Sequence, residues 1–212
     1  VFLMDGDAII MKTEELLQIL RKLYSSFPKL EKVTLYAGPK STLSKTPEEL
    51  RTLHEAGLSR AYLGVESGSD QVLQFIRKGV SAEEMLLAGQ RLVEAGIDLW
   101  VTVILGMTGA NGEGGGWGER ILSTAKMINA MKPRHLSAMT FAPAKGTPLG
   151  EDVLAGRFEV CSASHVLEEC RLLIEHLDVD PLHFTSNHAS NYLPLKGGLP
   201  EDRKRFLDMI DQ

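Results

Sequence analysis

Short apolar runs alternate with amphipathic stretches along most of the chain. Each run has the length of a buried strand, and most are rich in β-branched residues. The runs are Val1–Met4, Val33–Ala37, Arg60–Val65, Leu99–Gly106 and His135–Phe141. Between the first two, leucines recur at helical spacing within Glu14–Phe27, which predicts a helix with one apolar face. The pattern therefore predicts strands and helices in regular alternation.

The ends of the predicted helices carry specific signals. Thr46-Pro47-Glu48-Glu49 supplies an N-cap, a proline at the first helical position and a capping-box glutamate, and Ser81-Ala82-Glu83-Glu84 repeats the cap and the glutamate. Gly57, Gly79 and Gly96 mark helix ends, because glycine readily takes the left-handed conformation of a C-terminal cap.

A weak internal repeat indicates how the strands are connected. Glu55-Ala56-Gly57-Leu58 and Glu94-Ala95-Gly96-Ile97 each end a helix and lead into a strand, 39 residues apart (96 − 57). Parallel strands need a crossover of about a dozen or more residues, and the helices provide it. The fold class predicted is α/β with a parallel sheet.

The last part of the chain follows a different pattern. It contains a predicted helix Ser164–Leu177, a strand Leu182–Thr185, and a loop followed by a short helix from Pro200. No linker sets it apart. We therefore predict one domain over residues 1–212, in which 1–150 form a partial barrel and 151–212 a short C-terminal α/β extension.

Composition narrows the class of protein. Hydrophobic residues make up 43% and charged residues 24% of the chain, and the mean hydropathy is −0.05, which excludes disordered, collagen-like and membrane proteins. The apolar run Leu99–Met107 is about half of the roughly 20 residues that a membrane-spanning helix needs. The formal net charge of −5 gives no strong nucleic-acid signal. Two cysteines favour a cytoplasmic location over a disulfide-built secreted domain.

Glycines and polar residues follow each predicted strand. Ligands of parallel α/β proteins bind at the carboxyl ends of the strands, where glycine allows close approach and carboxylates accept hydrogen bonds. Ordinary turn chemistry explains any one such loop, but several on one rim favour a functional site. The segments are Asp5-Gly6-Asp7-Ala8, Tyr36-Ala37-Gly38-Pro39-Lys40-Ser41, Gly64-Val65-Glu66-Ser67-Gly68-Ser69-Asp70, Ile104-Leu105-Gly106-Met107-Thr108-Gly109 and Phe141-Ala142-Pro143-Ala144-Lys145-Gly146-Thr147.

One stretch has the character of a family motif. Tyr62-Leu63-Gly64-Val65-Glu66-Ser67-Gly68-Ser69-Asp70 continues through a helix to Ile76-Arg77-Lys78-Gly79. From Val1 to Pro148 the chain resembles the core barrel of radical S-adenosylmethionine (SAM) enzymes, closest to the branch with the methylthiotransferases and the oxygen-independent coproporphyrinogen oxidases. The resemblance implies a partial, TIM-like (β/α)6 barrel, and the strand pattern agrees with five of its six units.

The resemblance also implies a chemistry. Such enzymes bind SAM and a [4Fe–4S] cluster and cleave SAM to a 5′-deoxyadenosyl radical, which abstracts a hydrogen atom from a substrate. The substrate is unknown, and an electron donor such as flavodoxin or ferredoxin is implied. No catalytic residue is assigned. By position in the motifs, the cofactor-binding residues are Gly6 and Asp7 for the methionyl ammonium, Glu66 for the ribose, Lys78 for the carboxylate, and Ile104 and Gly106 for the adenine.

Two departures from the family pattern stand out. The family's first βα unit carries a CxxxCxxC cluster motif, whereas Cys161 and Cys170 here are nine residues apart and read as structural. The chain also opens within an apolar run, so we expect it to be part of a longer protein and to be inactive by itself. Lys78 stands where Arg is usual, and lysine lacks the bidentate fork of arginine.

Two other classes of function stay open. One is a cluster-free module that binds SAM or a partner, and the other is an aldolase- or isomerase-type barrel using Lys40 or Glu66. The histidines show no metal-ligand spacing, so no metal ligand is predicted. The polar cluster Asn187–Tyr192 can lie near the barrel mouth, with His188 either functional or simply hydrogen-bonded. Gly112–Gly118 is predicted to be a flexible loop at the same mouth.

Overall fold

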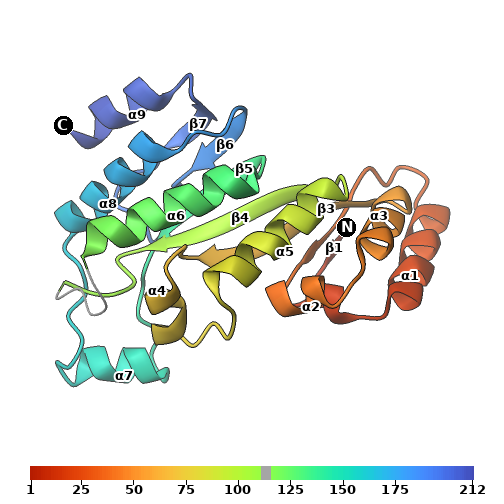
Figure 1. Cartoon of the computed structure of the whole chain (residues 1–212), viewed down its shortest axis with the longest axis horizontal. Coiled ribbons are helices and arrows are strands. Elements are labelled where there is room, and N and C mark those ends of the chain that lie inside the picture. The colour runs from red at the N-terminus through yellow and green to blue at the C-terminus, as the bar shows by residue number, and fades with distance from the viewer. Residues whose placement is uncertain (111–115) are drawn as a thin grey trace.

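A mostly parallel sheet organises the molecule, as the computed structural model shows for residues 1–110 and 116–212 (Figure 1). Within these residues the seven strands lie side by side in chain order. Strands β1 to β6 run parallel, and β7 pairs with β6 in the antiparallel sense. The strands are β1 (Phe2–Leu3), β2 (Val33–Tyr36), β3 (Leu58–Glu66), β4 (Asp98–Leu105), β5 (His135–Thr140), β6 (Leu182–Thr185) and β7 (Lys196–Leu199).

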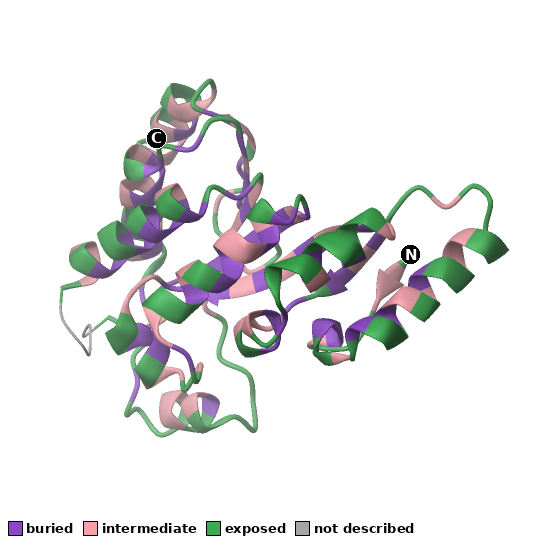
Figure 2. Cartoon of the chain, turned by 45° about the vertical axis from the view of Figure 1, so that its right-hand side comes forward, coloured by how far each residue is buried: buried purple, intermediate pink, exposed green. Residues whose placement is uncertain are grey.

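Helices connect the strands and cover one face of the sheet. Figure 1 shows α5 and α6 in front of the central strands, with α8 beside α6. Figure 2 shows the buried parts of these helices turned toward the sheet. The helices are α1 (Thr13–Ser26), α2 (Pro39–Leu43), α3 (Pro47–Glu55), α4 (Asp70–Phe75), α5 (Ala82–Glu94), α6 (Trp117–Met131), α7 (Pro148–Leu154), α8 (Ala163–His176) and α9 (Arg203–Ile210), with a 3-10 turn η1 at Ala8–Ile10.

Strand β4 shows how the core forms. Leu99, Val101, Val103 and Leu105 are buried beneath the helices, and the residues between them are only half-buried. Successive side chains of a strand point to opposite faces, so this alternation makes one face of the sheet apolar. The other face carries more polar side chains and is available for a site.

The predicted helix signals are largely confirmed. Thr46 and Ser81 both form complete capping boxes, with Glu49 and Glu84 respectively. Gly57 and Gly96 have φ of 106° and 84° and directly follow the C-caps of α3 and α5.

Gly79 was expected at a helix end, and this expectation is wrong. It has positive φ, but α4 already ends at Phe75, so Gly79 lies in the turn before α5.

Other elements are absent from the sequence prediction. The short helices α2 and α7 span too few residues to show a helical period. Strand β7, Lys-Gly-Gly-Leu, has no apolar alternation, and its backbone pairing with β6 alone defines it. The boundary at residue 150 between barrel and extension stays a prediction. Among the helices of the described ranges, none is long and apolar enough to cross a membrane.

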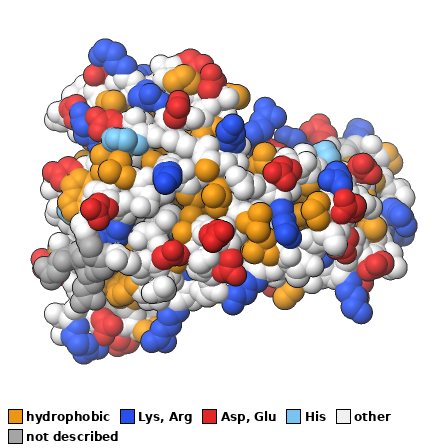
Figure 3. All heavy atoms as spheres, viewed as in Figure 1, with side chains coloured by type: hydrophobic (Ala, Val, Ile, Leu, Met, Phe, Trp, Pro, Cys, Tyr) orange, Lys and Arg blue, Asp and Glu red, His pale blue; other side chains and the backbone are white. Residues whose placement is uncertain are grey.

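On the helix-covered face, the charged side chains of the described residues are mixed in sign. Figure 3 shows acidic and basic side chains interspersed on this face, with apolar side chains between them. Such a mixed surface supplies no concentrated positive field there.

The loop after β3 packs directly on the backbone of α6, and this contact is testable. A Cβ on Gly68 would lie 2.5 Å from the Ser123 carbonyl oxygen, and the Gly68 N–H donates to Thr124 Oγ1 at 2.9 Å. We expect Gly68→Ala to lower the free energy of unfolding by about 1–3 kcal/mol, the usual cost of overpacking, in urea denaturation. Gly118→Ala is the control, because its Cβ would meet only Leu172 at 3.8 Å. Equal stabilities of the two variants would contradict the close approach.

Candidate functional site

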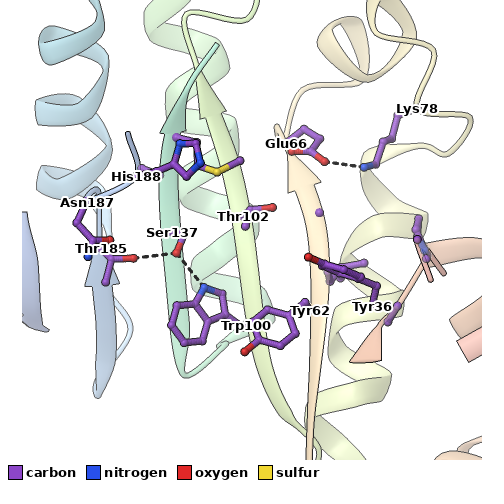
Figure 4. Close-up of a pocket in the computed structure, with 18 residues that line it drawn as sticks. Tyr36, Tyr62, Glu66, Lys78, Trp100, Thr102, Ser137, Thr185, Asn187 and His188 are labelled. Carbon is purple, nitrogen blue, oxygen red and sulfur yellow. Dashed lines mark hydrogen bonds and ion pairs between the residues drawn. The ribbon is translucent and has the colours of Figure 1, made fainter. Parts of the chain in front are cut away.

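A cavity of about 750 Å³ lies on the inner face of the sheet (Figure 4). Its walls come from β2 to β6 and from the loops at their carboxyl ends. Tyr62, Trp100 and Ser137 line it, and these are the residues that alternate with the buried ones along their strands. The cavity thus occupies the edge where parallel α/β proteins bind ligands.

Glu66 and Lys78 form an ion pair in the wall of this cavity. Lys78 Nζ donates to Glu66 Oε1 at 2.8 Å, and the two side chains are 23% and 17% exposed. Glu66 is the last residue of β3, and Lys78 follows α4. The structure therefore brings together two residues that the sequence assigned to the same cofactor.

The backbone at Glu66 is unusual. Its φ is 63°, and the Ser67 N–H donates to the Val65 carbonyl at 2.8 Å, so Glu66 sits at the centre of a γ-turn of the rare positive-φ form. The pairing of β3 with β4 also shifts register between Gly64 and Glu66. A left-handed conformation costs a non-glycine residue about 1–2 kcal/mol. Such strain is concentrated at functional sites.

Gly6 and Asp7 occupy different positions relative to the cavity. Gly6 lines it, whereas the Asp7 carboxylate accepts hydrogen bonds from the Gly38 N–H at 2.6 Å and from Ser41 Oγ at 2.5 Å. Asp7 thereby ties the residues after β1 to those after β2. A Cβ on Gly38 would overlap the Asp7 carboxylate, so a larger residue there would displace Asp7 from these hydrogen bonds.

Ile104 and Gly106 lie at the end of β4 and do not line the main cavity. Ile104 borders a second, much smaller cavity that it shares with Glu66 and Glu169. Gly106 has φ of 71°, and its N–H donates to Glu169 Oε2 at 2.6 Å. The two residues predicted to contact adenine therefore lie beside the main cavity, at the same edge of the sheet. Their role as an adenine site stays a prediction.

A buried cluster beside Gly106 escaped the sequence analysis. Cys161, His165 and Glu169 bring their ligand-type atoms within 4.8 Å of one another, and the Cys-x3-His-x3-Glu spacing at the start of α8 was the available signal. Burial raises the pKa of Glu169, and it raises the pKa of the Cys161 thiol to about 11, so the thiol stays protonated near neutral pH.

The charge of this cluster is already compensated within the protein. Glu169 is surrounded by the Gly106 N–H, by His165 at 3.3 Å and by the positive charge of Arg120. An additional cation would have to displace that arrangement in a desolvated environment. The cluster thus reads as an anchor for the loop after β4.

Aromatic rings cross the inner face from β1 to β5 and form the floor below the cavity. Ring centroids lie 4.8 Å apart for Phe2 and Tyr36, 6.0 Å for Tyr36 and Tyr62, and 5.6 Å for Tyr62 and Trp100. Trp100 then stacks on His135 at 4.6 Å and 7°. Rings in such a row bury apolar area while their polar edges stay available for hydrogen bonds.

Ion pairs lie next to this floor, at the amino ends of β4 and β5. Arg60 donates twice to Asp98 Oδ2, at 2.8 and 2.6 Å, and its guanidinium lies 5.1 Å from the Trp100 ring centre. His135 Nε2 lies 3.5 Å from the same carboxylate oxygen. Arg60, Asp98 and His135 come from three neighbouring strands, so the pairs connect β3, β4 and β5.

The remaining candidates take varied positions. Asn187 and His188 line the main cavity, from the segment after β6. Lys40 is exposed on α2 and is not part of the cavity wall. Of the loop expected over Gly112–Gly118, residues 112–115 lie outside the described ranges. Trp117 and Gly118 begin α6, so the expectation is wrong for these two.

The mostly parallel, open sheet with a cavity at the carboxyl ends of its strands is that of a partial α/β barrel. Comparison with known proteins agrees with this class. The model of the radical SAM superfamily matches residues 1–114, and the chain belongs to this superfamily of enzymes. No curated protein sequence matches the chain.

Solved structures confirm the predicted partial barrel. The archaeal Elp3 of Methanocaldococcus infernus, with residues 1–46 deleted, has a TM-score of 0.63 and 15% identity over 99% of this chain and 53% of its own. Coproporphyrinogen III oxidase (HemN) from Escherichia coli, a radical SAM enzyme, has a TM-score of 0.59 and 15% identity over 78% of this chain and 36% of its own. The chain thus spans about half of the Elp3 chain and about a third of HemN.

The half-buried His135 of the floor predicts a pH dependence. Burial lowers the pKa of His135, an effect that Asp98 opposes and Arg60 reinforces. The unfolded chain therefore binds this proton at a higher pH than the folded chain. Stability is full above the ordinary histidine pKa of about 6.5 and falls as the pH drops through it toward the lower folded value.

We expect the free energy of unfolding from urea denaturation to fall between about pH 7.5 and pH 5, and to fall less in His135→Gln. His176→Gln, at an exposed position of α8, serves as the control and should keep the wild-type slope. The assignment fails if His135→Gln and the wild type show the same dependence on pH.

Proposed function

We propose that this chain provides the SAM-binding part of a radical SAM enzyme. The observation that carries the proposal is the strained, half-buried Glu66 paired with Lys78 in a cavity at the carboxyl edge of a radical SAM fold. The cavity's volume, about 750 Å³, is within the range of ordinary small-molecule sites.

The polar groups of the cavity fit the parts of SAM. Glu66 Oε1 is engaged by Lys78, and Oε2 accepts no hydrogen bond from the described residues, so it is available to a ribose hydroxyl. An ammonium group has three donors, and Lys78 uses one of them on Glu66. The other two can hold a carboxylate.

Residues next to the Glu66–Lys78 pair would contact the methionyl ammonium group and the adenine of SAM. Asp7 has two hydrogen-bond donors on a carboxylate that offers about four lone-pair sites, which leaves room for an ammonium group beside Gly6. Ile104 and Gly106 would border the adenine, because they continue the same edge next to Glu66.

The iron–sulfur cluster does not fit the cysteines of this chain. Cys161 and Cys170 are buried, and burial raises the thiol pKa values to about 11 and about 12. The CxxxCxxC motif implied by the resemblance has three cysteines within eight positions, whereas this chain has two, nine residues apart. We therefore propose that the cluster ligands belong to a part of the intact protein outside these 212 residues.

In this superfamily the bound cofactors supply a 5′-deoxyadenosyl radical for hydrogen abstraction. The residues of this chain would bind and orient SAM and keep water from it. A cytoplasmic setting with flavodoxin or ferredoxin as electron donor belongs to the same proposal and rests on superfamily membership.

No observation specifically favours an aldolase- or isomerase-type barrel or a cluster-free binding module. A Schiff base needs a desolvated lysine, and Lys40 is exposed. A cluster-free module would use the same cavity, and iron and sulfide analysis of the intact protein after anaerobic reconstitution distinguishes it from the enzyme.

Calorimetric titration with SAM tests the proposal. Glu66→Ala should weaken SAM binding by about 1.5–3 kcal/mol, the range for hydrogen bonds to a charged group. Glu66→Gln should lose less, since the amide oxygen still accepts, and Lys78→Arg should retain binding because arginine holds a carboxylate through two donors.

The matched control is Glu31→Ala, which removes an exposed carboxylate from a loop. It should bind SAM like the wild type. Unchanged affinity in Glu66→Ala, or wild-type protein that binds no SAM, would count against the proposal.

A further inference from the structure

The end of the main cavity opposite Glu66 and Lys78 takes no part in the proposed cofactor site. Asn187 and His188 form it, from the segment that joins β6 to β7. In Figure 4 their side chains lie across the cavity from the Glu66–Lys78 pair, on the side of β6. A cavity with a cofactor at one end has this other end available for a second molecule.

The segment that carries these residues is fixed to the end of β5. Asn191 Nδ2 donates to the Ala138 carbonyl at 2.9 Å, and Asn191 Oδ1 accepts from Thr140 Oγ1 at 2.8 Å. The Thr140 N–H also donates to Ser190 Oγ at 3.3 Å. Both ends of the Asn191 amide are therefore occupied, and the loop is held in one arrangement.

The same contacts determine the tautomer of His188. The Ser190 N–H donates to His188 Nδ1 at 3.1 Å, and Ser190 Oγ lies 2.8 Å from that nitrogen. Since Ser190 Oγ accepts from Thr140, its own proton can point to Nδ1. With Nδ1 as an acceptor, the neutral imidazole carries its proton on Nε2. Nε2 has no hydrogen-bond partner among the described residues, so this donor is free for a ligand.

The wall between the two ends is aromatic and hydroxylated. Tyr62 and Trp100 present rings, and Trp100 Nε1 donates to Ser137 Oγ at 2.9 Å, which in turn lies 2.8 Å from Thr185 Oγ1. Of the described lining residues, Glu66 and Lys78 carry the full charges, and they neutralise each other. Asn187 and His188 are exposed, and the charged pair lies at the other end of the cavity, so a charged group beside His188 would gain no counter-charge from the described lining.

We propose that His188 and Asn187 form the substrate end of the cavity, and that the substrate is an uncharged molecule with a flat ring and a carbonyl oxygen. The ring packs on the aromatic wall, and the carbonyl accepts a hydrogen bond from His188 Nε2–H. Ser190 and Asn191 are positioning residues that hold the imidazole. This inference rests on the proposed function, which places the cofactor at the Glu66 end.

Three ring compounds of similar shape test the recognition. Benzamide is uncharged and has a carbonyl, benzoate is anionic, and benzylamine is cationic. The 212-residue chain, labelled with 15N-histidine, is titrated with each and followed by side-chain NMR. Benzamide should bind more tightly than the two charged probes and shift the His188 Nε2–H signal. The 15N shifts of the free protein should show Nδ1 unprotonated.

Variants separate a hydrogen bond from a structural effect. His188→Ala should weaken benzamide binding about threefold to tenfold, the effect expected for one neutral hydrogen bond. His188→Gln should recover most of the loss, because the glutamine amide also donates. His176→Ala, on the exposed surface of α8, is the matched control and should bind like the wild type.

The outcomes distinguish this inference from the proposed function. Tighter binding of a charged probe, an Nδ1–H tautomer, or unchanged benzamide affinity in both His188 variants overturns the inference. In a parallel titration with SAM, His188→Ala should keep the wild-type affinity. If it loses SAM as Glu66→Ala does, His188 belongs to the cofactor end and the inference fails while the proposed function stands. Benzamide binding that depends on His188 in a protein that binds no SAM supports the inference and defeats the function.

Discussion

The alternation of side chains along parallel strands is the constraint on which the structure depends. On β4, Leu99 and Val101 point beneath the helices, while Trp100 and Thr102 point into the cavity. A shift of one residue in register would exchange the two sets and expose the core. Because helical crossovers keep all strands from β1 to β6 parallel, their carboxyl ends also meet at one edge. The buried core and the ligand cavity are thus two consequences of the same alternation.

Aromatic side chains cover the inner face of the sheet at the bottom of the cavity. Trp100 packs between Tyr62 and His135, under the guanidinium of Arg60. Arg60 is held by Asp98, so the cation is neutralised where it is partly desolvated. Tyr62 and Trp100 thus belong both to this floor and to the wall of the cavity that holds the residues of the proposed site.

Local patterns in the sequence predict the parts of the fold that depend on local rules. Strand periodicity locates β2 to β6, and the capping boxes at Thr46 and Ser81 depend on residues three positions apart. Contacts across the sheet have no such signal. Arg60 meets Asp98 from 38 positions away, and Asn191 reaches Ala138 from 53. Their partners are decided by strand order and register.

The candidate site, too, is predictable from local sequence patterns only in part. The strand-end rule and the family resemblance identify Glu66 and Lys78, and the structure brings the two together. The rule alone does not separate residues that face the cavity from those that hold a loop. Asp7, for example, uses its carboxylate on Gly38 and Ser41, and the glycines at these strand ends have roles that depend on distant neighbours.

The backbone on both sides of the Glu66–Lys78 pair is strained. Glu66 and Arg77, the residue before Lys78, both have left-handed backbones, with φ of 63° and 55°. Each costs about 1–2 kcal/mol, whereas a partly exposed ion pair is worth about 1 kcal/mol or less.

The surroundings prevent this strain from relaxing. Val65 is fully buried on one side of Glu66, and Gly68 is pressed against α6 on the other. A Cβ on Gly64 would overlap the Glu66 carboxylate, so even the space for the pair depends on a glycine. The pair by itself does not offset the cost of aiming both side chains into the cavity. The packing around the pair therefore supplies the remaining stabilisation and keeps the carboxylate and the ammonium group aimed into the cavity, as the proposed SAM site requires.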